Sequence, residues 1–479
     1  MARELITEKQ KRKDARLLAE FHKYPPVYDP KFPLKAYDWD TLPYQITLPN
    51  GEIKDVYDHA LGMTREWGEK IWIKATNRLT KEERKDCQIV IIPPKQERLG
   101  NGDFSSALLK DLKGEQIGKY SAATFRRTRY EKVEYGKNID GQRKVKSVYI
   151  VASAVTDEDL SDIRAVAQEY RDAGAIEVNL IAPFIKDERE DKNVSKGSKN
   201  KRGAYNGRII KIKNVMESLS GFVDRIVTFE PHSAATHTFA ALSDIALAPL
   251  SLEEELIGEI KDKIWANRKK WVVVRPDAGR NLVATRIEKI YGLPGVHLEK
   301  LRDSNTRKSE TDNLTEKERK VLSGKNTILY DDEGGTLGTI KDIVMKKFIP
   351  AGVASINIFL GHARLQTKWR KNLNDIVDAA KKNNIPINIY FSDSRRPLGN
   401  LKAALKESKF KKIIKIVPIK DKVKKVINAC IGGVNFWVNK GNQGVDWERG
   451  ILQEVPWFDD INYEINFLKL LKEQKKLRQ

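Results

Sequence analysis

The stretch from residue 328 to residue 339 reads Ile-Leu-Tyr-Asp-Asp-Glu-Gly-Gly-Thr-Leu-Gly-Thr. Its apolar beginning has the composition of a short buried strand. A glycine-rich turn follows, and the residues from 339 to about 348 then have the apolar spacing of a helix. A strand, a turn and a helix in immediate succession are the repeating unit of α/β proteins that have a largely parallel sheet. This stretch therefore predicts an α/β fold.

The same alternation of short apolar runs and helical periodicity extends over most of the chain, from about residue 86 onward. The runs fall into two consecutive sets, which indicates two similar α/β domains with parallel sheets packed together. The predicted strands are 88–92, 147–152, 176–181 and 225–229 in the first set, and 270–274, 326–330, 354–359 and 387–391 in the second. The predicted helices are 157–173, 204–219, 281–291, 339–348 and 373–382.

The two ends of the chain differ from this pattern. The whole chain of 479 residues is long enough for two or three domains. Residues 1–85 have charged helical segments around a stretch rich in proline and aromatic residues, and residues 426–479 contain three tryptophans and a Lys-rich helix. We therefore predict a mainly helical N-terminal extension (1–85), two α/β domains (86–248 and 249–425) and a C-terminal appendage (426–479) that packs on the body or on a neighbouring subunit.

The net charge of +22 is compatible with nucleic acid, an anionic membrane surface or polyanionic small substrates as partners. The basic residues are spread along the chain and interleaved with acids, as in 315–320, so a generally basic surface explains the charge at least as well. Charge alone does not decide between these alternatives.

The other bulk features indicate a cytoplasmic protein. No stretch approaches the roughly 20 apolar residues of a membrane helix, so we expect no membrane partner. The N-terminus lacks an apolar run and a small-residue cleavage site, so we expect no secretory signal. The two cysteines, Cys87 and Cys430, are far apart and lack metal-type spacing, which argues against a disulfide framework.

Residues 331–339, at the turn between strand and helix, are the strongest functional signal. Ligands of an open parallel sheet bind beyond the carboxyl ends of its strands. A turn rich in glycine and threonine at a helix N-terminus offers N–H groups and hydroxyls to a phosphate. Asp331 and Asp332 suit the vicinal hydroxyls of a ribose. An Asp-rich helix cap with a glycine turn is the alternative, but the paired acids and two threonines favour a ribose-phosphate-binding loop.

Two other predicted strands also end in polar residues. The segment 272–280, Val-Val-Val-Arg-Pro-Asp-Ala-Gly-Arg, places Asp277 where it would be an oxygen ligand for Mg²⁺ or would merely cap a turn. The segment 226–232, Ile-Val-Thr-Phe-Glu-Pro-His, ends in His232. For His232, contact with a metal or a phosphate and a purely structural role both stay open.

In this order, the three stretches resemble the ribose-phosphate diphosphokinases, also called phosphoribosyl pyrophosphate synthetases. The resemblance runs from about residue 86 to about residue 438, with weaker matches at 148–153, 180–184 and 414–418. It implies two tandem domains of type I phosphoribosyltransferase fold. It also implies an enzyme that depends on Mg²⁺ and ATP and assembles as a homo-oligomer.

The resemblance assigns a role to individual residues. His232 and Asp277 would hold the Mg²⁺ of MgATP. Lys300 and Arg302 match two basic residues of a catalytic loop, in which Leu301 replaces a third, and they would neutralise charge on the transferred group. The implied ribose-phosphate-binding residues are Asp331, Asp332, Gly335, Thr336, Leu337, Gly338 and Thr339, and the implied ATP-binding residues are Phe125, Arg127, Arg129, Arg189 and His232.

The chain also departs from the family pattern. Gly335 stands where the loop usually has a third acid, and the acids that normally follow the residue matching Phe125 are replaced by a segment that contains Arg126, Arg127 and Arg129. The family's nucleotide-contacting arginine is displaced or replaced by Arg189. Lost acids and gained arginines would suit an acceptor with more phosphate than ribose 5-phosphate, such as ADP-ribose in NAD synthesis. The acceptor stays open between these two.

The expected reaction is attack of the anomeric hydroxyl of a 5-phosphorylated ribose on the β-phosphorus of ATP, which gives AMP and a 1-diphosphate product. Three alternatives remain. A non-catalytic regulatory homologue would have lost catalytic residues, whereas Lys300, Arg302, Asp277 and His232 are present. A phosphoribosyltransferase would not need the duplicated domain. A nucleic-acid-binding protein is supported by charge alone, so we do not expect nucleic acid as a partner.

Overall fold

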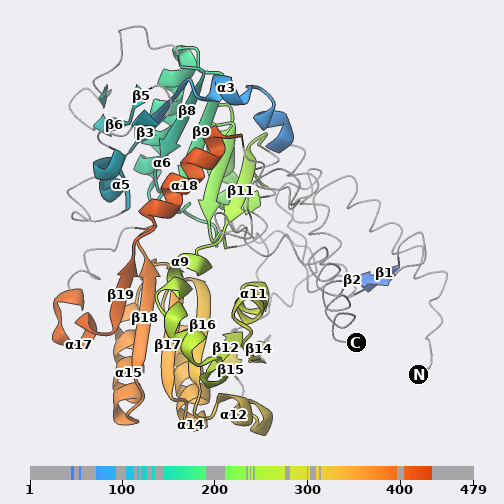
Figure 1. Cartoon of the computed structure of the whole chain (residues 1–479), viewed down its shortest axis with the longest axis vertical. Coiled ribbons are helices and arrows are strands. Elements are labelled where there is room, and N and C mark those ends of the chain that lie inside the picture. Colours follow the sequence, from blue (N-terminus) through green and yellow to red (C-terminus); the bar gives the residue numbers. More distant parts are fainter. Residues whose placement is uncertain are drawn as a thin grey trace, which may run out of the picture.

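The computed structural model consists of two α/β domains, one above the other in Figure 1, each built on a parallel sheet. Among the residues that it describes, no helix has the length and apolar character needed to cross a membrane. Predictions for most of the N-terminal extension and for the tail lie outside the described residues. The structure describes residues 45–47, 53–55, 72–92, 104–112, 116–117, 120–126, 132–134, 145–189, 211–232, 236–237, 239–240, 243–275, 281–298, 300–302, 309–311, 314–395 and 404–433.

The sheet of the first domain has the strand order β11-β10-β9-β8-β3-β6-β7, and only the β6–β7 pair is antiparallel among its described neighbours. All four strands predicted for this domain are confirmed. The strands β6, β7 and β11 were not predicted. Pro249 of β11 is tolerated because β11 is an edge strand paired only with β10 among the described strands. The strands are β3 (Cys87–Ile91), β6 (Ala123–Arg126), β7 (Lys132–Glu134), β8 (Ser147–Val151), β9 (Glu177–Ala182), β10 (Arg225–Phe229) and β11 (Ala246–Leu250).

The sheet of the second domain has the order β13-β12-β16-β17-β18-β19, and every neighbouring pair in it is parallel. The four strands predicted for this domain are confirmed. The strands β13 and β19 at the two edges were not predicted. The strands are β12 (Trp271–Arg275), β13 (Gly295–His297), β16 (Asn326–Glu333), β17 (Ser355–His362), β18 (Ile387–Ser392) and β19 (Ile414–Val417).

Helices cover both faces of each sheet, and this burial explains the continuous apolar runs. In β8, Val148 and Ile150 pack with α6 (Asp157–Asp172) and α7 (Lys211–Leu219). Tyr149 and Val151 face a larger apolar cluster that also contains core residues of the second domain. In the second domain α13 (Gly338–Ile343) and α15 (Trp369–Lys382) cover one face, and α11 (Asn281–Tyr291) covers the other. The predicted helices are confirmed, although 204–210 lie outside the described residues.

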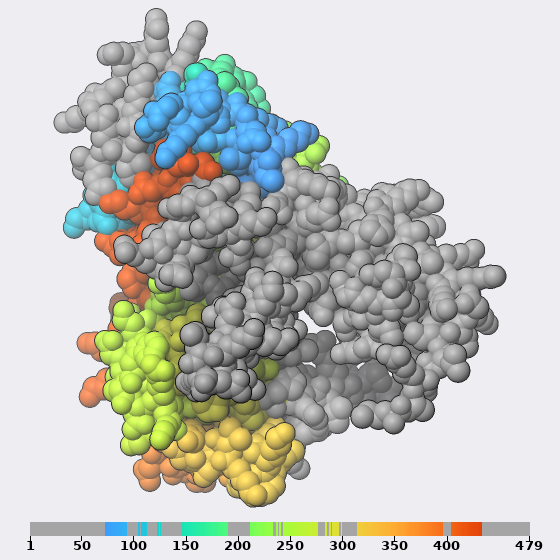
Figure 2. Space-filling model, turned by 45° about the vertical axis from the view of Figure 1, so that its right-hand side comes forward, coloured from blue at the N-terminus to red at the C-terminus, as the bar shows by residue number. Residues whose placement is uncertain are grey.

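The last described helix, α18 (Lys420–Ile431), crosses from the second domain to the first (Figure 1). It packs against α5 (Phe104–Leu112), and Lys420 pairs with Asp111 at 2.5 Å. Figure 2 shows this red segment beside the blue one near residues 72–92. The predicted domain limits fall within elements, since 248/249 lies in β11 and 425/426 lies in α18. The described contacts do not define the domain limits, which stay predictions.

The remaining described elements are short. The helical run of the second domain continues after α13 as a π-helical stretch (Val344–Phe348) and α14 (Ile349–Ala351). The linker between the domains forms α9 (Glu253–Gly258), α10 (Lys261–Ala266) and a 3-10 turn (Arg268–Lys270). The others are β1 (Gln45–Thr47) with β2 (Ile53–Asp55), α3 (Lys81–Arg84), β4 (Gln116–Ile117) with β5 (Tyr120–Ser121), β14 (Lys300–Arg302) with β15 (Ser309–Thr311), α12 (Glu316–Leu322) and α17 (Ser408–Lys411).

Candidate functional site

The predicted ribose-phosphate loop lies where β16 ends and the helical run from residue 338 begins. The loop is anchored to the segment that follows the neighbouring strand β17. Gly334 N donates to His362 O at 2.8 Å, Leu365 N donates to Gly334 O at 2.7 Å, and Gln366 N donates to Gly335 O at 3.1 Å. These three backbone bonds fix the path of the turn at the carboxyl edge of the sheet, where a parallel sheet binds its ligands.

Close packing explains the glycine at position 334. A Cβ on Gly334 would lie 2.7 Å from Cε1 of Phe391 and 3.0 Å from Cδ1 of Leu360, closer than van der Waals contact allows. Leu337, by contrast, adopts the left-handed conformation (φ 59°) with a side chain, which is buried. Gly338 N donates to the hydroxyl of the exposed Thr336 at 3.3 Å. The turn thus presents a hydroxyl and an amide at the start of the helical run.

A direct contact joins the two domains at this loop. Nδ1 of His232, just after β10, lies 2.6 Å from Oδ2 of Asp332. Asp332 is almost fully buried, whereas the side chain of His232 is 32% exposed. The backbone N–H of His232 donates to Oε2 of Glu188 at 3.2 Å. The fold therefore brings together two predicted site residues that are 100 positions apart in the chain.

Behind this contact, buried polar residues fix the two sheets against each other. Glu230 Oε1 accepts hydrogen bonds from Tyr330 Oη at 2.8 Å and from Ser251 Oγ at 2.7 Å, and burial raises the pKa of Tyr330. His362 contacts Phe229 O through Nε2 at 2.9 Å, and burial lowers the pKa of His362. The sequence analysis missed Glu230 and His362. Their signal was a polar residue at the end of an apolar run: Glu230 comes directly after β10, and His362 is the last residue of β17.

Acidic Glu333 is a second element of the site that the sequence analysis did not assign. Its Oε1 lies 2.5 Å from Nε of Arg189, in the first domain, and 3.2 Å from Nη1 of Arg364, after β17. A Cβ on Gly335 would lie 3.3 Å from Nη1 of Arg189. Position 335, which lacks the family acid, is therefore beside an arginine of the other domain.

The other predicted residues are not brought to this edge by described contacts. Phe125 is buried in the core of the first domain. Lys300 and Arg302 lie in β14, which pairs with β15, and the structure describes only their backbone. Asp277, Arg127 and Arg129 lie outside the described residues. Within the described part of the chain, no group of three or more His, Cys, Asp or Glu side chains is arranged to hold a metal ion.

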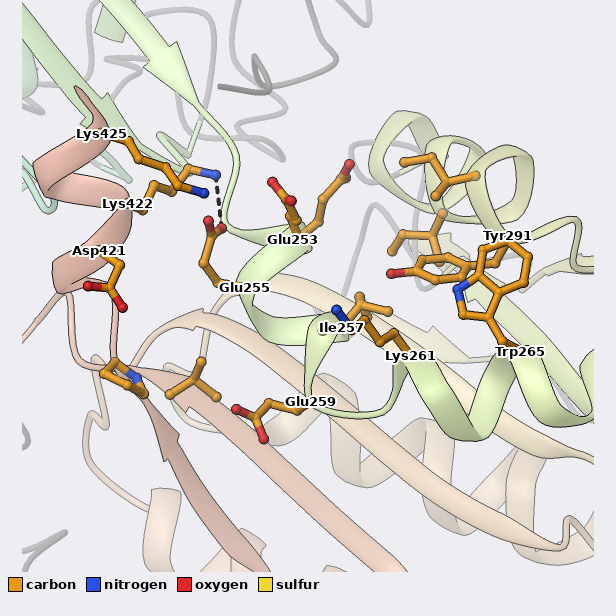
Figure 3. Close-up of a pocket in the computed structure, with 16 residues that line it drawn as sticks. Glu253, Glu255, Ile257, Glu259, Lys261, Trp265, Tyr291, Asp421, Lys422 and Lys425 are labelled. Carbon is orange, nitrogen blue, oxygen red and sulfur yellow. Dashed lines mark hydrogen bonds and ion pairs between the residues drawn. The ribbon is translucent and has the colours of Figure 1, made fainter. Parts of the chain in front are cut away.

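A cavity of about 540 Å³ lies elsewhere, between the linker helices α9 and α10, the helix α11 and the start of α18 (Figure 3). One wall contains Trp265 and Tyr291, whose ring centroids are 5.6 Å apart. The opposite wall contains Lys422, which pairs with Glu255 at 2.8 Å. No predicted site residue belongs to its described lining. The cavity is therefore separate from the ribose-phosphate loop.

The chain is similar to known proteins that carry one name. No family model matches the chain. A "Ribose-phosphate pyrophosphokinase" of Halobacterium salinarum is 26% identical over 267 residues, which cover 54% of this chain and 85% of the relative. A protein of the same name from Methanopyrus kandleri is 25% identical over 217 residues, covering 43% of this chain and 68% of the relative.

Solved structures show the same architecture. The phosphoribosylpyrophosphate synthetase of Mycobacterium smegmatis matches with a TM-score of 0.51 at 18% sequence identity, and the match covers 72% of this chain and 99% of that one. The expected fold of two tandem α/β domains is confirmed. The chain is therefore similar in sequence to ribose-phosphate pyrophosphokinases and has the fold of a phosphoribosylpyrophosphate synthetase.

Proposed function

We propose that this protein transfers the β,γ-diphosphate of ATP to the anomeric hydroxyl of a 5-phosphorylated ribose and releases AMP. The observation that carries the proposal is the 2.6 Å contact between His232 and Asp332. His232 belongs to the domain expected to bind the nucleotide, and Asp332 belongs to the loop expected to bind the ribose. If these expectations hold, the contact would make the nucleotide side and the acceptor side neighbours across the domain boundary. The names of the relatives support the same reaction.

In this reaction a bond forms between the anomeric oxygen and the β-phosphorus, and the bond from that phosphorus to the oxygen of the α-phosphate breaks. AMP leaves with the electron pair, and the anomeric hydroxyl loses its proton. Such transfers depend mainly on positioning and on charge neutralisation. Asp331 and Asp332 would orient the ribose hydroxyls, and Thr336 would contact the 5-phosphate. Basic residues on the β14–β15 hairpin would face the transferred diphosphate.

The residues present fit a Mg²⁺ ion through oxygen ligands. Asp331 and Asp332 provide carboxylates, which Mg²⁺ prefers. Because Nδ1 of His232 contacts Asp332, the ring would meet a nucleotide or a metal-bound water through Nε2. Mg²⁺, when bound, would neutralise part of the triphosphate charge. The other predicted ligand, Asp277, lies outside the described residues.

The identity of the acceptor is a separate question. The relatives carry the name of enzymes that act on ribose phosphate. Gly335 in place of an acid, next to Arg189, favours an acceptor with more negative charge, such as ADP-ribose. We take ribose 5-phosphate as the first acceptor to test and ADP-ribose as the second.

The test is to incubate the purified chain with ATP and Mg²⁺ and with each acceptor in turn, and to measure AMP. Formation of AMP that requires an acceptor supports the proposal. Absence of AMP with both acceptors contradicts it. A regulatory homologue would instead change the rate of an active synthetase without forming AMP. Salt-sensitive retention on nucleic acid without AMP formation would favour a nucleic-acid-binding protein.

A further inference from the structure

Three arginines and one glutamate lie near the carboxyl edge of the second sheet. Arg189 follows β9 of the first domain, Arg364 follows β17, and Arg395 follows β18. Glu333 pairs with the first two, at 2.5 Å and 3.2 Å. Burial and then the charge of Arg364 lower the pKa of Arg395, and the charge of Glu333 raises it. Glu333 is therefore paired with two guanidinium groups, and the third, that of Arg395, lies over Phe184, whose ring contacts the ring of His362 at the end of β17.

Arg395 is the member whose hydrogen-bonding capacity is least used. Its Nε and Nη1 atoms are buried and have no hydrogen-bond partner among the described residues. Its guanidinium lies 4.9 Å from the centre of the Phe184 ring. Burial, together with Arg364, lowers the pKa of Arg395 to about 10, so the group stays charged at neutral pH. A charged group whose buried N–H atoms are unsatisfied is costly, and an anion would offset that cost.

The cluster adjoins the turn that is proposed to bind the 5-phosphate. Glu333 comes two residues before Gly335, and the side chain of Arg189 approaches the space where a side chain at 335 would begin. Backbone bonds from Leu365 and Gln366 to the turn hold the segment of Arg364 against it. A phosphate in this cluster would therefore be a neighbour of one bound at Thr336.

We propose that Arg189, Arg364 and Arg395 form a second phosphate subsite, which binds the distal phosphate of an acceptor whose ribose 5-position carries a diphosphate ester. The inference rests on the proposed function, because it assumes that the loop 331–339 binds the first phosphate. Guanidinium groups suit the role, since their planar fork binds phosphate oxygens in pairs. The subsite would make the chain prefer a diphosphate ester of ribose to a monophosphate.

An alternative use of the same arginines is to hold the two domains together. Arg189 does so through Glu333. Arg395 has no ion pair among the described residues but lies over Phe184 of the first domain, so the affinity ratio between the two acceptors, rather than one affinity, separates ligand binding from domain packing. Arg319 provides a matched control because it lies on α12, donates to Pro350 O at 2.6 Å and is partly exposed.

The test measures ligand binding by calorimetry on the whole chain, without turnover, for wild type, Arg395→Gln, Arg395→Lys and Arg319→Gln. The probes are ADP-ribose, ribose 5-phosphate and a non-hydrolysable ATP analogue. We expect Arg395→Gln to weaken ADP-ribose binding about 10- to 100-fold, corresponding to a lost charged hydrogen bond, and ribose 5-phosphate binding less than about threefold. Arg395→Lys should give an intermediate loss, and Arg319→Gln should give none.

Several outcomes would overturn the subsite. The first is that Arg395→Gln weakens the binding of both acceptors equally or of neither. The second is that the wild-type chain does not prefer ADP-ribose. The third is that only binding of the ATP analogue is weakened, which would assign the arginines to the nucleotide. If Arg395→Gln fails to fold, Arg395→Lys decides by the same ratio of affinities. Failure of the proposed function looks different, because AMP would not form although the binding difference persists.

Discussion

The edge of the second sheet and the cavity of Figure 3 both contain many charged side chains, but their charges are arranged differently. In the cavity, Lys422 pairs with Glu255, and Lys415, beside the cavity, pairs with Glu259 of its lining. At the sheet edge, Arg189 and Arg364 share Glu333, and Nε and Nη1 of Arg395 have no hydrogen-bond partner among the described residues. Paired charges such as Lys422 and Glu255 are typical of residues that hold elements together, whereas a buried charged group with unsatisfied N–H atoms favours an anionic ligand. The comparison assigns stability to the first region and binding to the second.

Breaking the buried pair of the cavity should give the largest effect. Lys422 is 1% exposed, so Lys422→Met leaves Glu255 without its partner. Removing one partner of a buried ion pair costs about 3–5 kcal/mol of unfolding free energy, which urea denaturation would measure. The control is Lys415→Met, whose lysine is 57% exposed and which should cost no more than about 1 kcal/mol. Equal losses in the two variants would contradict the assignment of this pair to stability.

Asp332→Asn should affect activity rather than stability. The substitution keeps the size of the side chain but removes the carboxylate that contacts His232 and would orient the ribose. We expect kcat/KM for AMP formation to fall about 100-fold, as misplacement of reacting groups does, with little change in Tm. Asp378→Asn, on the surface of α15, is the matched control. Unchanged kcat/KM in Asp332→Asn would remove Asp332 from the site.

Buried histidine in the first domain should make stability depend on pH. Burial lowers the pKa of His237 to about 3, whereas the unfolded chain has an ordinary value near 6.5. Below pH 6.5 the unfolded state binds more protons, so unfolding free energy falls as pH falls, by about 2 kcal/mol between pH 7 and pH 5. His237→Gln should remove this part of the slope in urea denaturation at the two pH values. An unchanged slope would mean that His237 is not buried as a neutral ring.

The sequence was sufficient for elements whose residues decide their structure locally. In β8 both faces are buried, and the apolar run is continuous, so the strand was predictable. The strand β11 contains a proline and two alanines, which do not favour a strand, and it forms because it pairs with β10. Its detection requires knowledge of the neighbouring strand.

The candidate site divides in the same way. The loop 331–339 could be interpreted from the order of its residues alone. The contact between His232 and Asp332 depends on how two domains pack, which no local pattern encodes. Arg364 and Arg395 were not predicted for a related reason. A single arginine after a strand resembles a solvated surface residue until three strand ends are brought to the same place.

Gly335→Asp offers the smallest and most specific change at the sheet edge. The substitution restores the acid that the family usually has, and its Cβ would lie 3.3 Å from Nη1 of Arg189. The new carboxylate would pair with Arg189 and compete with a phosphate for it, so we expect the affinity for ADP-ribose to fall about tenfold, or about 1.4 kcal/mol, relative to ribose 5-phosphate. Gly335→Ala adds the Cβ without the charge and separates crowding from electrostatics. If both variants lower the two affinities alike, crowding of the turn and not lost charge explains the effect, and the sheet edge then resembles the cavity, with charges that serve packing.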